Sequence, residues 1–281
     1  MASTSTRKGP SMSTQTAAVT SKDGTTITYD RHGDGPPLVV VDGALSSRAM
    51  GSGQLIAPVL ADRFSVYVYD RRGRGDSGDT APFATDREVE DLLAVIEAAG
   101  GSADVFGHSS GAALALEAAR QGAAIRHLAL YEVPMVVDAS RSPVGNDFRS
   151  RLQALVDQGQ RSQAIKLFMT EGVGAPKAMA MIMPITPAWK KITPIAHTLP
   201  YDIAHVEEFL HGRPLPGGRW DDLDLPILVI AGGKSPAWMR HAMDELSRAL
   251  PHAQLKVLDG QTHMLKPEVT GPVLADFFAA T

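Results

Sequence analysis

The chain has 281 residues, of which 44% are hydrophobic and 21% are charged. This composition is typical of a folded globular protein rather than a disordered chain, and the length suits one large domain or two small ones. A net charge of −4 argues against a nucleic acid or an anionic membrane as the partner. Because the chain has no cysteine, disulfides and thiolate metal sites are excluded, and the cytoplasm is the default location.

Residues 1–15 are rich in Ser and Thr and lack the apolar stretch of a signal peptide, so we expect a disordered tail. No apolar run approaches the ~18 residues that a membrane span needs. From residue 16 onward, strands and helices alternate. We predict a hairpin of strands at 17–20 and 25–29, further strands at 37–41, 64–69, 103–106 and 125–131, and helices at 52–61, 85–99 and 110–121.

The sequence changes character between residues 136 and 222, where we predict no strand but helices at 146–158, 162–171, 176–183 and 202–211. Alternation then resumes, with strands at 226–231 and 254–258 and helices at 236–250 and 267–280. This order predicts an α/β fold in which helices cover both faces of a mostly parallel sheet. We expect a core of residues 16–135 and 223–281, and a helical cap of residues 136–222.

The candidate nucleophile is Ser109, in the sequence Gly107-His108-Ser109-Ser110-Gly111 between an apolar strand and an alanine-rich helix. In that context Gly-x-Ser-x-Gly is typical of a nucleophile elbow, a sharp turn that pushes one serine outward. The two glycines are needed because the backbones on either side of the turn come too close for side chains. The plainer alternative is a strand-to-helix turn that carries serines by chance.

A serine nucleophile needs a base to take its proton, and the base usually needs an acid to orient it. Of the nine histidines, only His263 lies in a turn directly after the last predicted strand. In this architecture the nucleophile, the acid and the base follow in that order along the chain, so His263 is the predicted base. We expect His108, beside the nucleophile, to point away from it and to pack.

The chain resembles the α/β-hydrolase-fold serine hydrolases from about residue 16 to the C-terminus. Three features carry the resemblance: the elbow at Ser109, His263 after the last strand, and the loop Asp70-x-Arg72-Gly73-x-Gly75-x-Ser77 after the fourth strand. The resemblance implies the α/β-hydrolase fold, esterase or lactonase chemistry and a mainly structural role for the loop.

The acid departs from the usual pattern of this family, which places an Asp after the penultimate strand. Here Ser235 occupies that position, and serine cannot hold an imidazolium by charge. Some members, including haloalkane dehalogenases and zearalenone-type lactonases, instead use a carboxylate at the end of the strand after the elbow. The resemblance therefore implies Glu132 as the acid, and it leaves open the alternatives Asp221, Asp222, Asp224 and Asp259.

The loop after the third strand begins Asp42-Gly43, where the family usually has His-Gly and zearalenone-type lactonases have Asp-Gly. Backbone N–H groups hold the oxyanion, so the side-chain change need not abolish the site. The resemblance implies that the N–H groups of Ala44 and Ser110 form the oxyanion hole, and that Gly43 permits a close backbone approach. Asp42 is left either as a structural turn residue or with a local catalytic role.

The sequence contains no nucleotide, metal or other cofactor motif, so no cofactor is expected. The short basic run Arg71, Arg72 and Arg74 is expected to be solvated, or paired with Asp70 and Asp76, rather than bound to nucleic acid.

The predicted cap is rich in methionine and other apolar residues, which favours a hydrophobic small-molecule substrate of moderate size. We select Met135, Met181 and Trp189, together with Gly43, as substrate-binding candidates. The predicted function is a cofactor-independent serine hydrolase that cleaves an ester or lactone through an acyl-enzyme. Carbon–carbon bond hydrolysis, perhydrolysis and a non-hydrolytic ligand-binding or biosynthetic role remain alternatives, and whether the chain forms a homo-oligomer is left open.

Overall fold

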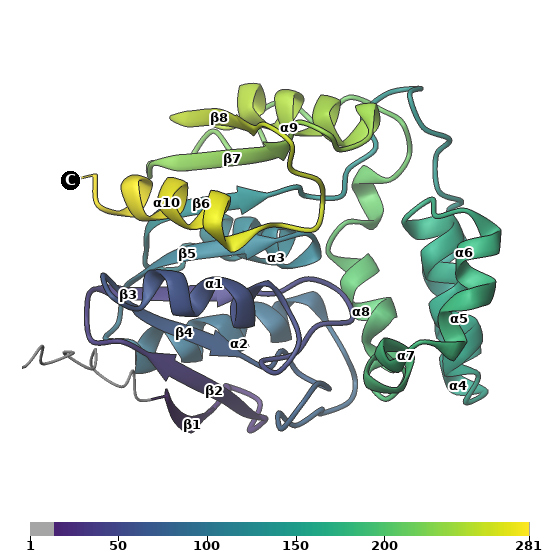
Figure 1. The fold of residues 1–281 in the computed structure, drawn as a ribbon, viewed down its shortest axis with the longest axis horizontal. Coiled ribbons are helices and arrows are strands. Elements are labelled where there is room, and N and C mark those ends of the chain that lie inside the picture. The colour runs from purple at the N-terminus through teal and green to yellow at the C-terminus, as the bar shows by residue number, and fades with distance from the viewer. Residues whose placement is uncertain (1–13, 281) are drawn as a thin grey trace, which may run out of the picture.

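An eight-stranded sheet runs through the computed structural model, which describes residues 14–280 (Figure 1). The strand order is β1-β2-β4-β3-β5-β6-β7-β8; the pairs from β4 to β8 are parallel, and those of β1 with β2 and β2 with β4 are antiparallel. The bounds are β1 Thr14–Thr20, β2 Thr26–His32, β3 Pro37–Val41, β4 Ser65–Tyr69, β5 Ala103–His108, β6 Ile125–Tyr131, β7 Ile227–Gly232 and β8 Ala253–Leu258.

The predicted tail lies mostly outside the described residues, which begin at Thr14. Thr14 and Gln15 themselves belong to β1, because they pair with His32 and Arg31 of β2. The prediction of disorder is therefore wrong for these two residues, and the hairpin is longer than the sequence indicated.

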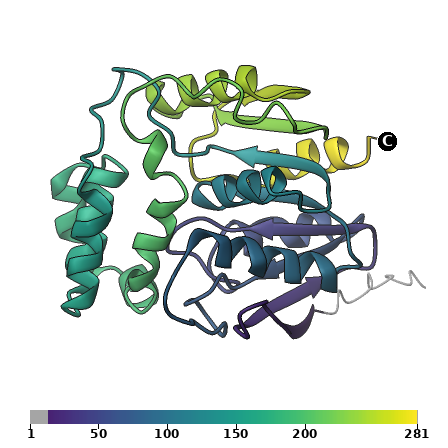
Figure 2. The ribbon, with the colours of Figure 1, turned by 180° about the vertical axis from the view of Figure 1, so that it is seen from behind.

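Helices cover both faces of the sheet, as predicted (Figures 1 and 2). Alternate residues of β3 show why: Leu38 and Val40 pack with one set of helices, and Val39 and Val41 pack with the other. A strand buried on both faces is apolar at every position, which is the pattern that the sequence carries here. The first set is α1 Ser52–Leu60 and α10 Pro267–Phe278; the second is α2 Thr85–Ala98, α3 Ser110–Arg120 and α9 Ala237–Ala249.

Between β6 and β7 every regular element is helical, and we call residues 136–222 the helical insertion. It lies at the edge of the sheet where the parallel strands end, on the right of Figure 1. Its helices are α4 Phe148–Asp157, α5 Arg161–Leu167, α6 Lys177–Ile182, α7 Pro187–Ile192 and α8 Leu199–Ala204. A π-helical turn, η1 Phe168–Gly172, follows α5, and short 3₁₀ turns lie at η2 Met183–Ile185, η3 Ala196–Thr198 and η4 Glu207–Phe209.

The insertion differs from the prediction in two helices. Helix α7 was not expected, and the helix expected at 202–211 is instead α8 followed by η4. Helix α8 begins earlier because Pro200 lies in its first turn, where proline needs no hydrogen-bond donor.

The insertion packs tightly on the sheet, since its buried side chains Leu152, Ile165 and Ile203 belong to the same apolar cluster as Val39 of β3. No helix within residues 14–280 is both long enough and apolar enough to cross a membrane.

Candidate active site

Ser109 occupies the sharp turn between β5 and α3, with φ 57° and ψ −128°. L-residues rarely adopt a positive φ, so this serine is held in a strained conformation. A Cβ on Gly107 would lie 2.5 Å from the Cα of Ala112, and one on Gly111 would collide with the carbonyl oxygen of Val41. The turn therefore requires glycine at both flanking positions, as the sequence pattern indicated.

Three side chains from separate parts of the chain meet at this turn. The Oγ of Ser109 lies 3.1 Å from Nε2 of His263, and Nδ1 of the same ring lies 2.9 Å from Oε2 of Glu132. Glu132 is fully buried, and its other oxygen accepts a hydrogen bond of 2.7 Å from the Gly232 N–H. With Nδ1–H donating to the carboxylate, Nε2 carries the lone pair that can accept the serine proton.

The end of β7 holds the acid in its unusual position. The N–H of Gly232, the last residue of this strand, donates to Glu132, and Ser235 lies in the following loop where the family usually has its carboxylate. The other carboxylates considered from the sequence, at positions 221, 222, 224 and 259, are all exposed, and none of them bonds to His263. Glu132 is thus the carboxylate that the fold brings to the imidazole.

The loop that carries His263 is anchored by two side chains from the strands beside it. Nε2 of His108 donates to the His263 carbonyl at 3.0 Å, and the Tyr131 hydroxyl donates to the Thr262 carbonyl at 2.7 Å. Burial, together with the nearby charge of His263, lowers the pKa of His108 to about 3, so its ring is neutral near pH 7. The sequence predicted that His108 packs. Its hydrogen bond could not be predicted from neighbouring residues, because the partner lies 155 positions away.

The two predicted oxyanion donors flank the serine. Ser110 is the first residue of α3, and within the described chain neither its N–H nor that of Ala44 has a hydrogen-bond partner. Both residues line the cavity in front of Ser109. The neighbouring Gly43 lies so close that a Cβ there would be 2.8 Å from the Cβ of Ser109 and 3.0 Å from the His108 carbonyl oxygen.

Asp42 has a structural role. It is 2% exposed, and its carboxylate accepts hydrogen bonds from the backbone N–H groups of Ser52 and Gly53 at the start of α1. Burial raises its pKa even though these donors oppose the shift. It is not among the residues that line the cavity.

A cavity of about 140 Å³ lies against Ser109 and His263. This is close to the ~150 Å³ that accommodates one benzene molecule in an engineered protein cavity. Within residues 14–280 no lysine or arginine lines it, and both of its carboxylates, Glu132 and Asp202, are engaged in hydrogen bonds. Its apolar walls come from the segment after β6, from the insertion and from the start of α9, and consist of Pro134, Phe168, Val173, Ile203, Val206, Leu210, Pro236, Trp238 and Met239.

We call the lining residues Phe168, Gly172, Val173 and Trp238 the outer wall of the cavity. Arg141 joins its two parts, the end of η1 and the start of α9. It donates hydrogen bonds of 2.6 Å to the carbonyls of Glu171 and Gly172 at the end of η1. Its guanidinium also stacks 4.6 Å from the centre of the Trp238 ring on α9.

None of the four substrate-binding candidates, Gly43, Met135, Met181 and Trp189, is among the residues that line this cavity, so the structure does not support their prediction as pocket residues. Met135 is fully buried, Trp189 is 7% exposed within the apolar cluster, and Met181 is 75% exposed. A methionine-rich composition indicates an apolar insertion, but it does not reveal which side chain faces which cavity. The residues that do line the pocket come partly from the stretch where one continuous helix was predicted.

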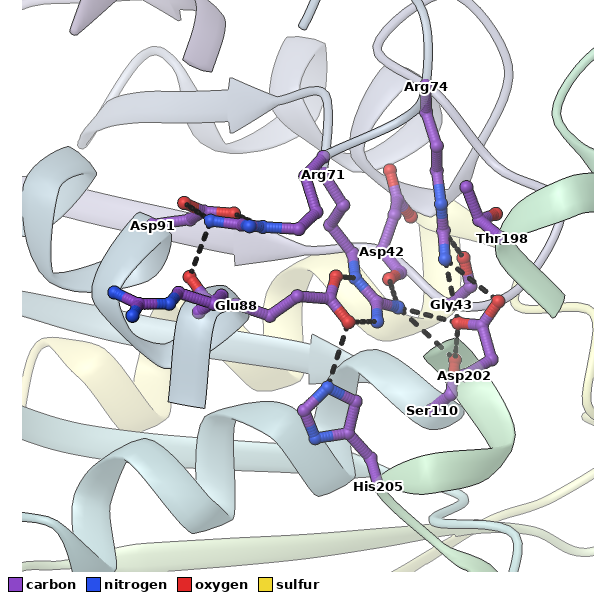
Figure 3. A network of polar contacts seen from close by, with 12 residues as sticks. Asp42, Gly43, Arg71, Arg74, Glu88, Asp91, Ser110, Thr198, Asp202 and His205 are labelled. Carbon is purple, nitrogen blue, oxygen red and sulfur yellow. Dashed lines mark hydrogen bonds and ion pairs between the residues drawn. The ribbon is translucent and has the colours of Figure 1, made fainter. Parts of the chain in front are cut away.

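The interpretation of the basic run was also wrong. Arg71, Arg72 and Arg74 are 2%, 0% and 1% exposed, and Figure 3 shows Arg71 and Arg74 beside the acidic side chains of Glu88 and Asp202. Asp70 and Asp76, their expected partners, bond instead to another arginine, at position 48. The actual partners are Glu88, Asp91 and Asp202, with Asp23 at the edge. Burial alone would raise the pKa of Glu88, but Arg71 and His205 hold that pKa well below its usual range.

Within residues 14–280, no group of three or more His, Asp or Glu side chains is arranged to hold a metal ion.

Known proteins match both the sequence and the structure. A crystal structure of an alpha/beta hydrolase from Sphaerobacter thermophilus is 49% identical, with a TM-score of 0.87 over 94% of this chain and 100% of that one. The structure of 2-hydroxy-6-oxo-6-phenylhexa-2,4-dienoate hydrolase from a Rhodococcus species shares the fold at 20% identity, with a TM-score of 0.66 over 95% of this chain and 100% of that one.

A curated relative, N-formylmaleamate deformylase of Pseudomonas putida, is 38% identical over 107 residues, which are 37% of this chain and 39% of the relative. The match thus spans about two fifths of that relative's length. The family model described as "Alpha/beta hydrolase family" matches residues 25–269, most of the chain. With the fold described above, these matches show that the chain belongs to the alpha/beta hydrolase family.

Proposed function

We propose that this protein is a cofactor-independent serine hydrolase that cleaves an ester or lactone of a small, uncharged, hydrophobic compound. The observation that carries the proposal is the hydrogen-bonded series from Ser109 through His263 to the buried Glu132, which opens on an apolar cavity. A serine in such a series is activated as a nucleophile, because the imidazole removes its proton as the new bond forms.

The first half of the reaction forms an acyl-enzyme. The Oγ of Ser109 attacks the carbonyl carbon while its proton passes to Nε2 of His263, and Glu132 stabilises the resulting imidazolium. The oxyanion accepts hydrogen bonds from the N–H groups of Ala44 and Ser110, next to the positive end of the α3 dipole. When the tetrahedral intermediate collapses, His263 gives its proton to the leaving alcohol.

In the second half a water molecule takes the place of the alcohol. His263 removes a proton from this water as its oxygen attacks the acyl carbon, and the same N–H groups hold the second oxyanion. Collapse breaks the bond to Ser109, whose oxygen takes the proton back from His263. The acid product leaves and the starting protonation states are restored.

The lining of the cavity supports an uncharged substrate. A carboxylate in this cavity would lose its hydration without gaining a lysine or arginine partner, which costs several kcal/mol. The relatives' names refer to N-formylmaleamate and a phenylhexadienoate, both of which are carboxylates. We therefore transfer the hydrolase chemistry of these relatives to this chain, but not their anionic substrates. The volume suits an acyl group about the size of a butyryl chain or one ring.

The test uses a fluorophosphonate probe and a pair of esters. The probe should label the wild-type protein and should not label Ser109→Ala. The value of kcat/KM for p-nitrophenyl butyrate should exceed that for p-nitrophenyl hemisuccinate, which adds a carboxylate at similar length, by at least about 100-fold. A folded wild-type protein that is neither labelled nor active on the neutral ester would refute the hydrolase assignment and favour a non-hydrolytic role. Equal turnover of the two esters would refute the substrate class alone.

A further inference from the structure

A buried ionic cluster adjoins the candidate active site through Asp202, which also lines the cavity, and the proposed reaction steps do not use this cluster. Figure 3 shows the cluster from close by. Asp202, from α8 of the insertion, is at its centre and is 1% exposed. One of its oxygens accepts hydrogen bonds from Arg71 at 2.8 Å, Arg74 at 2.8 Å and the Ser110 hydroxyl at 2.7 Å. Its other oxygen accepts a second bond from Arg74, also at 2.8 Å.

Both arginines also reach the loop after β3. Nη1 of Arg74 donates to the Gly43 carbonyl at 2.6 Å, and Nη1 of Arg71 donates to the Asp42 carbonyl at 3.2 Å. The bond from Arg74 is short and charge-assisted, the kind that fixes its acceptor most firmly. The side chain of Arg74 thus connects a carboxylate of the insertion to the backbone of the oxyanion loop.

The Gly43 carbonyl and the Ala44 N–H belong to the same peptide unit. This unit is trans and planar, so its C=O and N–H point in opposite directions. A guanidinium that holds the carbonyl on one side fixes the N–H on the other side, where Ala44 lines the cavity beside Ser109. A cation on the carbonyl also withdraws electron density from the amide and makes its N–H a stronger donor.

We propose that Arg74 is a positioning residue for the oxyanion hole, and that Asp202 of the insertion holds Arg74 in place. Asp202 is also bonded to the hydroxyl of Ser110, so one carboxylate constrains both predicted oxyanion donors. This inference rests on the proposed hydrolase function, because it concerns the same oxyanion. Arg74 does not line the cavity and acts only through the Gly43–Ala44 peptide.

A purely stabilising role explains the cluster less well. Burying charges costs free energy, and Nε of Arg74 is buried without any partner in the described part of the chain.

The chain supplies a matched control in Arg72, which is two positions away, fully buried and bonded twice to Asp91 at 2.7 Å. Arg72 makes no hydrogen bond to the oxyanion loop or to the insertion.

The test compares Arg74→Lys with Arg72→Lys. Lysine keeps the charge but lacks the fork that reaches both the carbonyl and the carboxylate. With p-nitrophenyl butyrate, we expect Arg74→Lys to lower kcat by about 10- to 100-fold while KM changes less than about 3-fold. The inhibition constant of a trifluoromethyl ketone, which forms an oxyanion on the serine, should rise by the same factor. Arg72→Lys should melt at a lower temperature and keep kcat within about 3-fold of the wild type.

Each outcome decides between the proposals. If the wild type hydrolyses esters and the two lysine variants have equal kcat and equal inhibition constants, the positioning role is wrong and the hydrolase function stands. If the wild type neither turns over esters nor binds the ketone, the hydrolase function fails and the positioning role fails with it. Should Arg74→Lys not fold, Asp202→Asn, which keeps the shape and loses the charge, takes its place. An unchanged kcat in that variant would overturn the proposal.

Discussion

Replacing Glu132 with glutamine tests the candidate site most sharply, because the side chain keeps its shape and loses only its charge and one acceptor. In the native arrangement one carboxylate oxygen accepts from Nδ1 of His263 at 2.9 Å and the other accepts from the Gly232 N–H at 2.7 Å. Both neighbours are donors, and a glutamine has only one oxygen to offer them.

Either orientation of the new amide disturbs the histidine. If its oxygen faces His263, its NH₂ group meets the N–H of Gly232, and two donors are buried against each other. If its oxygen faces Gly232, its NH₂ group donates to Nδ1, and the imidazole proton moves to Nε2. That tautomer cannot take the proton of Ser109. Loss of the negative charge further destabilises the imidazolium in the transition state.

We expect Glu132→Gln to lower kcat by about 10³- to 10⁴-fold, which corresponds to about 4–5.5 kcal/mol of transition-state stabilisation. KM for p-nitrophenyl butyrate should change little, since the residue does not contact the acyl group in the proposed mechanism. The control is Asp259→Asn, an exposed carboxylate four positions before His263. Steady-state kinetics and the rate of fluorophosphonate labelling measure the effect. A Glu132→Gln variant within about 10-fold of the wild-type kcat would refute the assignment of the acid.

Three further perturbations test other parts of the site. Gly43→Ala should lower kcat at least about 10-fold, since its Cβ would lie 2.8 Å from that of Ser109; unchanged kinetics would contradict this crowding. Arg72→Gln should cost about 3–5 kcal/mol in urea unfolding by leaving Asp91 buried without its partner, and a loss below about 1 kcal/mol would oppose this reading. The pKa of His108 is about 3 in the folded protein and 6.5 unfolded, so only the unfolded chain gains this proton as pH falls from 6.5 towards 3. Between pH 7.5 and 4.5 the free energy of unfolding of the wild type should therefore fall by up to about 3 kcal/mol more than that of His108→Gln. Equal losses in the two proteins would contradict the lowered pKa.

The fold could be predicted from sequence because its signals are local. The continuous apolar strands, the helices between them and the glycines around Ser109 each follow from the backbone of a short stretch. His263 could be selected because it lies in the turn after the last predicted strand, and Glu132 was implied by the resemblance to family members whose acid lies at the end of the strand after the elbow. The order of nucleophile, acid and base along the chain then reduced the candidates for the acid and the base to a few residues.

The arginine cluster could not be predicted in the same way. Neighbouring acids seemed the natural partners of Arg71 and Arg74, but their actual partner, Asp202, is 131 and 128 positions away. Buried ion pairs are selected by tertiary packing, and the sequence of the loop after β4 does not encode which helix packs against it. The same limit applies to the pocket, since composition predicted an apolar lining but not that Ile203 and Val206 would form it.

The outer wall of the pocket differs from the inner wall, formed by Ile203 and Val206 of the insertion, in how well it tolerates substitution of its side chains. The inner wall includes Ile203, next to the carboxylate that ties α8 to the loops around the serine, so a substitution there disturbs the catalytic geometry as well as the pocket. The outer wall, with Phe168 in η1 and Val173 just after it, is joined to α9 through Arg141, which binds mainly backbone carbonyls. Because backbone carbonyls survive any change of side chain, substitutions at Phe168 and Val173 leave these hydrogen bonds in place. Divergence of substrate range between relatives, and its redesign in the laboratory, should begin at this wall.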